Sequence, residues 1–149
     1  MNMIVTPSSS AVRVPLFDMQ VDFFDRLSDF DIAGAAEILA DDCLFLFPGL
    51  KPVHGAALTT RMLRVIRRRF AEIRWTRTMS LNAEPDWMIS AWTVKGTFAG
   101  GGAYENEVVS VVRLNGAGQV AYLSDYFKST DFSAPAPTRD AHGALHLRT

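Results

Sequence analysis

Residues 87–128 read WMISAWTVKGTFAGGGAYENEVVSVVRLNGAGQVAYLSDYFK, and this stretch decides the fold class. It contains three segments rich in β-branched and aromatic residues, at 87–98, 104–114 and 119–128. A glycine tripeptide, Gly100-Gly101-Gly102, and the turn Asn115-Gly116-Ala117-Gly118 separate these segments. Short glycine-containing connections between such segments are typical of β-hairpins. The stretch therefore predicts three consecutive antiparallel strands.

Two further strands are predicted upstream of this stretch. Around residues 73–81 apolar side chains alternate with polar ones, which is the spacing of a strand with one buried face. The apolar set is Ile73, Trp75, Met79 and Leu81, and Arg77 interrupts it. Earlier, the continuous apolar run of residues 43–47 stops at Pro48-Gly49. That run indicates a short buried strand.

The remaining segments have helical spacing. We expect helices at 16–27, 32–40 and 56–70, because apolar residues recur there every three or four positions. The apolar stripe of the third helix is Leu58, Met62, Ile66 and Phe70. Segregation of helices from strands indicates an α+β fold. We predict a cone-shaped domain in which three N-terminal helices pack on a strongly curved, mostly antiparallel sheet, with a concave pocket between the layers.

The composition is that of one globular domain. The chain has 149 residues, of which 48% are hydrophobic and 21% charged, close to the average for folded domains. We expect a flexible arm at 1–15, the α+β domain at 16–132 and a Pro-rich tail at 133–149. The net charge of −1 argues against a nucleic-acid partner. We therefore expect the run Arg67-Arg68-Arg69 to lie on a solvated helix face.

The sequence carries no sign of membrane insertion or export. No apolar run approaches the roughly 18 residues of a membrane-spanning helix, and the N-terminal residues do not form a signal-peptide pattern. Cys43 is the single cysteine, so no intrachain disulfide can form. We expect no membrane partner and a cytoplasmic location.

Alternation along the last strand places one carboxyl group in the pocket. Asp125 shares a side with Leu123 and Phe127, whereas Tyr122 and Tyr126 share the opposite side. Burial among apolar walls raises the pKa of a carboxyl group, which makes Asp125 the candidate catalytic residue, and a contact with a base such as Arg77 would lower that pKa instead. The expected ligand-binding residues are Phe45, Phe47, Trp92, Val94, Asn106, Val108 and Leu123. We expect an apolar small-molecule ligand, with Asp125 and Asn106 as its polar anchors.

Four motifs in this order give the chain a family resemblance. They are residues 31–42 (DIAGAAEILADD), the run 44–48 with Val53-His54-Gly55, the tripeptide Tyr104-Glu105-Asn106, and Ser124-Asp125-Tyr126-Phe127. The chain resembles the nuclear transport factor 2-like superfamily and, within it, the SnoaL-like proteins. The resemblance covers about residues 14–132. It implies the same cone-shaped α+β fold, but not one function, because the superfamily includes both enzymes and binding proteins.

The resemblance allows three family activities to be compared with the residues. Ketosteroid isomerases carry a carboxylate just before the proline of the first strand, where this chain has Phe47. Limonene epoxide hydrolases use an Arg-x-Asp pair, which would fall on Val94 and Gly96 here, and a second Asp that matches Asp125. SnoaL-like cyclases use an Asp in a largely apolar pocket, without metal or cofactor, and Asp125 is its counterpart.

Two functions from different classes remain open at this point. The first is a cofactor-free acid/base enzyme of cyclase, isomerase, dehydratase or hydrolase type, with epoxide hydrolysis as a further alternative. The second is a binding protein of the same fold without turnover. A second polar group facing the cavity near Asp125 would favour catalysis. We expect no metal site, and a homodimer through the outer sheet face, where Ile89, Ala91, Tyr122 and Tyr126 gather. That face could also make the protein an interaction module.

Overall fold

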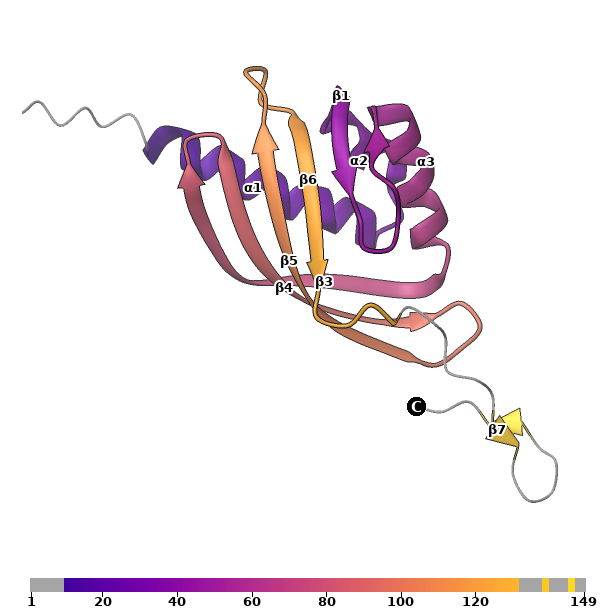
Figure 1. The fold of residues 1–149 in the computed structure, drawn as a ribbon. Helices are drawn as coiled ribbons and strands as arrows, with labels where there is room; N and C mark the ends of the chain where they lie inside the picture. The colour runs from indigo at the N-terminus through magenta and orange to yellow at the C-terminus, as the bar shows by residue number, and fades with distance from the viewer. Residues whose placement is uncertain (1–9, 132–137, 140–144, 147–149) are drawn as a thin grey trace, which may run out of the picture.

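A computed structural model describes residues 10–131, 138–139 and 145–146 (Figure 1). The helices are α1 (Ser10–Ser28), α2 (Ile32–Glu37) and α3 (Ala56–Arg67). The first nine residues of the expected arm, and most of the expected tail, lie outside the described residues. Helix α1 begins at Ser10, within the expected arm, and the division of the chain into arm, domain and tail stays a prediction.

The main sheet has six strands in the order β2-β1-β6-β5-β4-β3. Their bounds are β1 (Leu39–Leu46), β2 (Val53–His54), β3 (Phe70–Glu84), β4 (Trp87–Phe98), β5 (Ala103–Leu114) and β6 (Val120–Phe127). All neighbours are antiparallel except β1 and β6, which run parallel. A separate two-stranded sheet joins β7 (Thr138–Arg139) and β8 (Leu145–His146). The predicted α+β architecture, with three helices on a curved and mostly antiparallel sheet, is confirmed.

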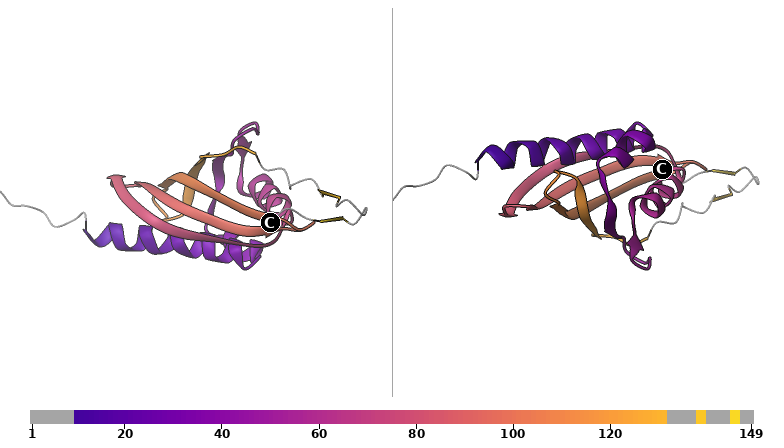
Figure 2. Two further views of the ribbon diagram at one scale, coloured as in Figure 1. Left: turned by 90° about the horizontal axis from the view of Figure 1, so that it is seen from below. Right: turned by 90° about the horizontal axis from the view of Figure 1, so that it is seen from above.

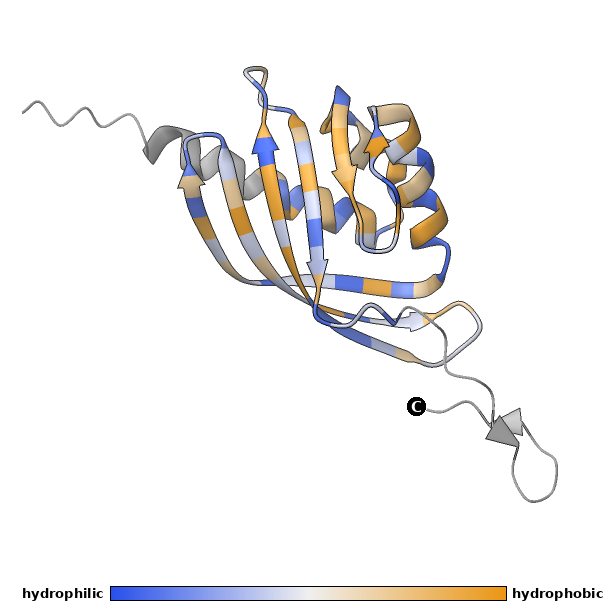
Figure 3. Ribbon diagram, viewed as in Figure 1, coloured by the Kyte–Doolittle hydropathy of each residue, from blue (hydrophilic) through white to orange (hydrophobic). Residues whose placement is uncertain are grey.

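The hydrophobic core lies between the helices and the concave face of the curved sheet. The long strands β3, β4 and β5 bend across α1, which lies along one face of the sheet (Figure 2). Hydrophobic and hydrophilic residues alternate along these strands (Figure 3), as expected for a sheet with two different faces. The described helices include none that is long and apolar enough to cross a membrane.

The second helix is shorter than predicted, and the first strand begins earlier. Helix α2 ends at Glu37, and Leu39 already pairs with Val120 of β6. The backbone N–H of Val120 donates to the carbonyl of Ile38 at 2.9 Å. Pairing with β6 therefore draws Leu39 and Ala40 into the sheet, although the sequence predicts that the helix continues to residue 40. Similarly, α3 ends at Arg67 and Phe70 begins β3.

A β-bulge divides the apolar side of β3 between the two faces of the sheet. Trp75 pairs with Val94 on the helix side, but beyond the irregularity between Arg77 and Met79 the register changes. Met79 then pairs with Ala91, on the outer face. One extra residue reverses the alternation of a strand. The prediction of one continuous apolar face from Ile73 to Leu81 is therefore wrong.

The buried side of α3 is turned by one residue from the predicted stripe. Thr59, Leu63 and Arg67 are buried, whereas Leu58 is exposed. The Arg67 guanidinium donates to the carbonyl oxygens of Leu27 (3.1 Å), Ser28 (3.0 Å) and Phe70 (2.8 Å). Burial lowers the pKa of Arg67 from its ordinary value. The prediction of a solvated arginine face is wrong for Arg67, which joins the end of α1 to the start of β3.

Candidate functional site

A pocket lies between the helices α1 and α3 and the concave face of the sheet. Its empty space, including the part open to solvent, is about 510 Å³. The lining residues are Phe23, Phe24, Leu27, Phe45, Phe47, Leu63, Ile66, Phe70, Ile73, Trp75, Val94, Tyr104, Leu123, Asp125 and Phe127. Only Tyr104 and Asp125 among them carry an oxygen in the side chain. The pocket therefore suits an apolar molecule that carries few polar groups.

Strand β6 carries Asp125 into this pocket. Asp125 pairs with Ser110 of β5, and its neighbours on the same face, Leu123 and Phe127, also line the pocket. Asp125 is partly buried. Its Oδ1 accepts a hydrogen bond from the Ser110 hydroxyl at 2.5 Å. This is the only hydrogen bond of the Asp125 carboxyl group among the described residues, and no described basic side chain forms an ion pair with it.

The surroundings of Asp125 raise the pKa of its carboxyl group to about 7. Burial among apolar side chains is the main cause, because it disfavours the charged form, and the hydrogen bond from Ser110 opposes it by stabilising the anion. A carboxyl group with this pKa exists in both protonation states near neutral pH. It can therefore accept a proton and return it, which is the requirement for general acid/base catalysis.

Further polar residues continue from Asp125 across the core. Ser110 is fully buried and pairs with Ser90 of β4, which is also fully buried. The Ser90 hydroxyl donates to Oε1 of Gln20 on α1, and Nε2 of Gln20 has no hydrogen-bond partner among the described residues. Ser110, Ser90 and Gln20 were not among the predicted site residues, although alternation along β5 places Ser110 on the same face as Asn106 and Val108. The sequence signal for Ser90 was its position among the inward-facing apolar residues of β4, between Met88 and Trp92.

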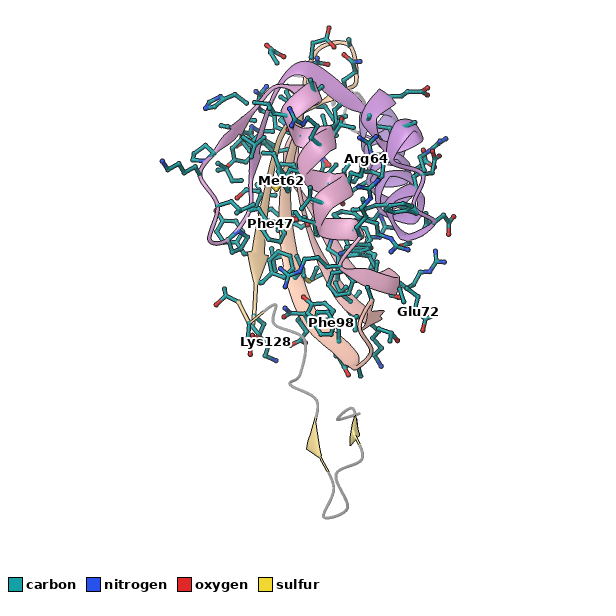
Figure 4. All side chains as sticks on the ribbon, turned by 90° about the vertical axis from the view of Figure 1, so that its right-hand side faces the viewer. Phe47, Met62, Arg64, Glu72, Phe98 and Lys128 are labelled. Carbon is teal, nitrogen blue, oxygen red and sulfur yellow. The ribbon has the colours of Figure 1, made fainter. Side chains whose placement is uncertain are left out.

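The structure brings five of the eight predicted site residues together. Phe45, Phe47, Val94, Leu123 and Asp125 line the pocket. The ring of Phe47 contacts that of Phe127 with centroids 5.0 Å apart. Phe47 lies beside α3 on the side shown in Figure 4, with Phe98 below it.

Trp92, Asn106 and Val108 face the helix side of the sheet but do not line the pocket. The ring of Phe24 covers Trp92, with centroids 4.4 Å apart. Val108 is fully buried in the core. The prediction that these three residues form pocket walls is corrected accordingly, because they lie on the inner face of the sheet but outside the lining of the pocket.

Asn106 uses its whole amide within the protein. Its Nδ2 donates to the Tyr104 hydroxyl (2.9 Å) and to the Ser129 carbonyl (2.8 Å). Its Oδ1 accepts from the backbone N–H groups of Glu107 (2.9 Å) and Ser129 (3.1 Å). Asn106 therefore fixes the end of β6 and orients Tyr104, and Tyr104 is the residue that reaches the pocket. Sequence reasoning missed Tyr104, although strand alternation places it on the same face as Asn106.

Within the described residues, no three His, Cys, Asp or Glu side chains are placed to hold a metal ion. Most of the tail, including His142, lies outside those residues, and the expectation of no metal site stays a prediction.

These features define the class of the protein. It is an α+β domain whose three helices and curved sheet enclose an apolar pocket with one ionisable carboxyl group. The family model of the SnoaL-like domain matches residues 21–123. The chain belongs to this family, so the resemblance drawn from its motifs is confirmed. No curated protein matches the sequence.

Solved structures with the same fold have low sequence identity to this chain. A candidate polyketide cyclase from Xanthomonas campestris pv. campestris is 14% identical, with a TM-score of 0.69 over 77% of this chain and 91% of that one. An epoxide hydrolase of Mycobacterium tuberculosis that resembles limonene epoxide hydrolase is 17% identical, with a TM-score of 0.66 over 77% and 84%. Another M. tuberculosis protein, crystallised in complex with estradiol-17beta-hemisuccinate, is 17% identical, with a TM-score of 0.66 over 75% and 92%. At these identities the likeness establishes the fold alone.

Proposed function

We propose that this protein is a cofactor-free acid/base enzyme that acts on an apolar small molecule in the pocket, with Asp125 as the group that transfers the proton. One observation carries the proposal. A carboxyl group with a pKa of about 7 faces an otherwise apolar pocket, with one oxygen held by Ser110. Its other oxygen has no partner among the described residues and is available to a ligand.

The pocket supports a proton-transfer reaction of cyclase, isomerase, dehydratase or hydrolase type. The ionised carboxylate takes a proton from a C–H or O–H group of the ligand, and the resulting acid returns it to another atom. Ser110 holds the carboxyl group in one orientation during both steps. Aromatic rings from α1, β1 and β3 offer flat surfaces to a cyclic ligand. The steroid derivative bound by the M. tuberculosis neighbour is consistent with such a ligand.

A binding protein without turnover is the second candidate, and the scarcity of polar groups in the pocket favours it. Epoxide hydrolysis has less support, because Asp125 is the only carboxyl group among the lining residues. The family's epoxide hydrolases require a second one.

The reaction of 5-nitro-1,2-benzisoxazole tests whether Asp125 acts as a base. A carboxylate removes the ring hydrogen next to nitrogen, the N–O bond breaks, and a coloured cyanophenolate forms. The carboxyl group then releases the proton to solvent. We expect the wild type to accelerate this reaction and Asp125→Asn to be slower by roughly 100- to 10,000-fold. Asp86→Asn makes the same change at an exposed turn and should retain the wild-type rate. Equal rates for Asp125→Asn and the wild type would contradict catalysis by Asp125.

We also propose that a second copy of the chain covers the outer face of the sheet. Large apolar side chains stand exposed there: Met79 at 59%, Leu81 at 55%, Val109 at 39% and Tyr126 at 58%. They come from β3, β5 and β6, on the side of the sheet away from α1. A contiguous apolar surface of this kind is unusual on a monomer, and a two-fold axis through it pairs the face with itself.

Light scattering at micromolar concentration tests this assembly. We expect a dimer for the wild type, and a monomer for Met79→Glu combined with Tyr126→Glu. Arg61→Glu combined with Arg68→Glu, at exposed positions of α3 and the residue after it, is the control and should stay dimeric. A monomeric wild type would contradict the proposal.

A further inference from the structure

Tyr104 is the second lining residue with an oxygen in its side chain, and it lies near the start of β5, six residues before Ser110. It is buried, with 7% exposure. Its ring lies among those of Phe70 and Phe98, with centroids 4.9 and 5.4 Å away, and the rings of Phe70 and Phe98 stack on each other at 5.1 Å. The aromatic packing therefore holds the phenol group in place beside the pocket that it lines.

The hydrogen bonds around Tyr104 leave its own hydrogen without an acceptor. Its oxygen accepts from Nδ2 of Asn106. The orientation of that amide is fixed, because the backbone N–H groups of Glu107 and Ser129 both donate to Oδ1, and Nδ2 also donates to the Ser129 carbonyl. Both lone pairs of Oδ1 are thereby used, so Asn106 cannot accept a hydrogen bond from Tyr104. No other bond to the Tyr104 hydroxyl exists among the described residues.

A buried tyrosine hydroxyl normally donates a hydrogen bond. Burial also raises the pKa of Tyr104, so the phenol keeps its proton at neutral and mildly basic pH. Among the described residues Tyr104 has no acceptor for its hydrogen, and a ligand in the pocket that Tyr104 lines can supply one.

We propose that Tyr104 is a ligand anchor that donates a hydrogen bond to a carbonyl or ether oxygen at the end of the ligand remote from Asp125. This inference rests on the proposed function, since it requires that the pocket binds an apolar small molecule. It adds the class of ligand: an elongated molecule with two or more rings and a hydrogen-bond acceptor at its far end.

The register of the sheet sets the scale of that ligand. Tyr104 precedes Ser110, the partner of Asp125, by six residues on β5, which corresponds to roughly 20 Å of extended strand. Strand β5 bends along its length (Figure 1). Because the two anchors lie six residues apart on one strand, a ligand that reaches both is longer than a single small ring.

Two probes that differ in one oxygen test the role of Tyr104. 2-Acetylfluorene carries a carbonyl group at one end, and 2-ethylfluorene has the same skeleton without it. Equilibrium dialysis at about pH 8.5 compares their dissociation constants, because Asp125 is then mostly ionised and no longer donates a hydrogen bond. We expect the wild type to prefer the acetyl probe, and Tyr104→Phe to reduce that preference by roughly 3- to 10-fold. Tyr122→Phe removes a hydroxyl from the other face of the sheet and should leave the preference unchanged.

The possible outcomes separate this inference from the proposed function. An acetyl preference in Tyr104→Phe equal to that of the wild type would overturn the role of Tyr104, and the pocket would stand as a binding site. Equal losses of affinity for both probes would mean that Tyr104 contacts the ligand without donating a hydrogen bond to it, and would also overturn the inference. Failure of both probes to bind the wild type would contradict an apolar ligand pocket altogether. The variant keeps the ring and leaves Asn106 bonded to Ser129, and its thermal midpoint checks that it folds.

Discussion

Replacement of Ser110 by alanine isolates the one hydrogen bond that Asp125 receives. The Ser110 hydroxyl is fully buried and donates to Oδ1 of Asp125 at 2.5 Å. This bond stabilises the carboxylate and so works against the effect of burial on its pKa. Ser110→Ala removes the donor and leaves the apolar walls in place. The pKa of Asp125 should therefore rise further above its ordinary value.

The size of the change follows from the strength of the bond. A hydrogen bond to a charged group contributes about 1.5–3 kcal/mol, and 1.36 kcal/mol corresponds to one pKa unit. Ser110→Ala should thus move the pKa of Asp125 from about 7 to roughly 8 to 9. At pH 7 most of the variant would then carry a protonated Asp125, and the ionised fraction that acts as a base would fall by roughly 5- to 50-fold.

The pH dependence of the benzisoxazole reaction measures this change. The wild-type rate should rise with pH through a midpoint near 7 as Asp125 ionises. The midpoint of Ser110→Ala should lie higher. Ser124→Ala is the matched control, because Ser124 is buried next to Asp125 but on the outer side of β6. A midpoint in Ser110→Ala that equals or falls below that of the wild type would refute the reasoning.

Three further predictions concern stability and pH. The raised pKa of Asp125 means that the folded protein keeps this proton while the unfolded chain loses it, so the free energy of unfolding should fall as pH rises from about 4 to about 7, by at most about 4 kcal/mol. Asp125→Asn should remove this pH-dependent loss, which urea unfolding at pH 5 and pH 8 measures. Parallel pH profiles of stability for the two proteins would argue against the prediction. Arg67→Met leaves three buried carbonyl groups without their donor and should cost roughly 3 kcal/mol or more, whereas the exposed Arg68→Met should change stability by less than about 0.5 kcal/mol; similar losses in urea titrations of both variants would contradict a structural role for Arg67. Met79→Thr on the outer face should leave the wild-type pH profile of the reaction unchanged, because the bulge turns Met79 away from the pocket, and a shifted midpoint would contradict that placement.

The sequence was most informative where local patterns coincide with tertiary packing. The predicted bounds of β4, Trp87–Phe98, agree with the structure, because a turn precedes this strand and glycines follow it. The start of β1 was missed, because Leu39 and Ala40 fit the helical pattern of residues 32–40 and enter the sheet only through parallel pairing with β6. The bulge near Thr78 was also missed, since either register of β3 presents apolar residues to one face and only the pairing with β4 decides between them.

The candidate site was predicted to the level that strand alternation allows. Alternation placed Asp125 on the inner face together with Leu123 and Phe127, and all three line the pocket. It could not show that Phe24 of α1 covers Trp92, because that contact depends on how the helix crosses the sheet. Alternation also could not show that Tyr104 lines the pocket and Asn106 does not, because both residues lie on the same face. The difference depends on the backbone N–H groups of Glu107 and Ser129, which donate to the amide oxygen of Asn106.

The titration of the Asp125 carboxyl group tests the central claim most directly. In protein labelled with ¹³C at the aspartate carboxyl carbon, Asp125→Asn identifies the resonance of Asp125 by its disappearance. The account predicts that this resonance titrates with a pKa of about 7 in the wild type, well above the ordinary value near 4 for aspartate. A resonance of Asp125 that titrates near 4 would contradict a buried acid/base group in the pocket.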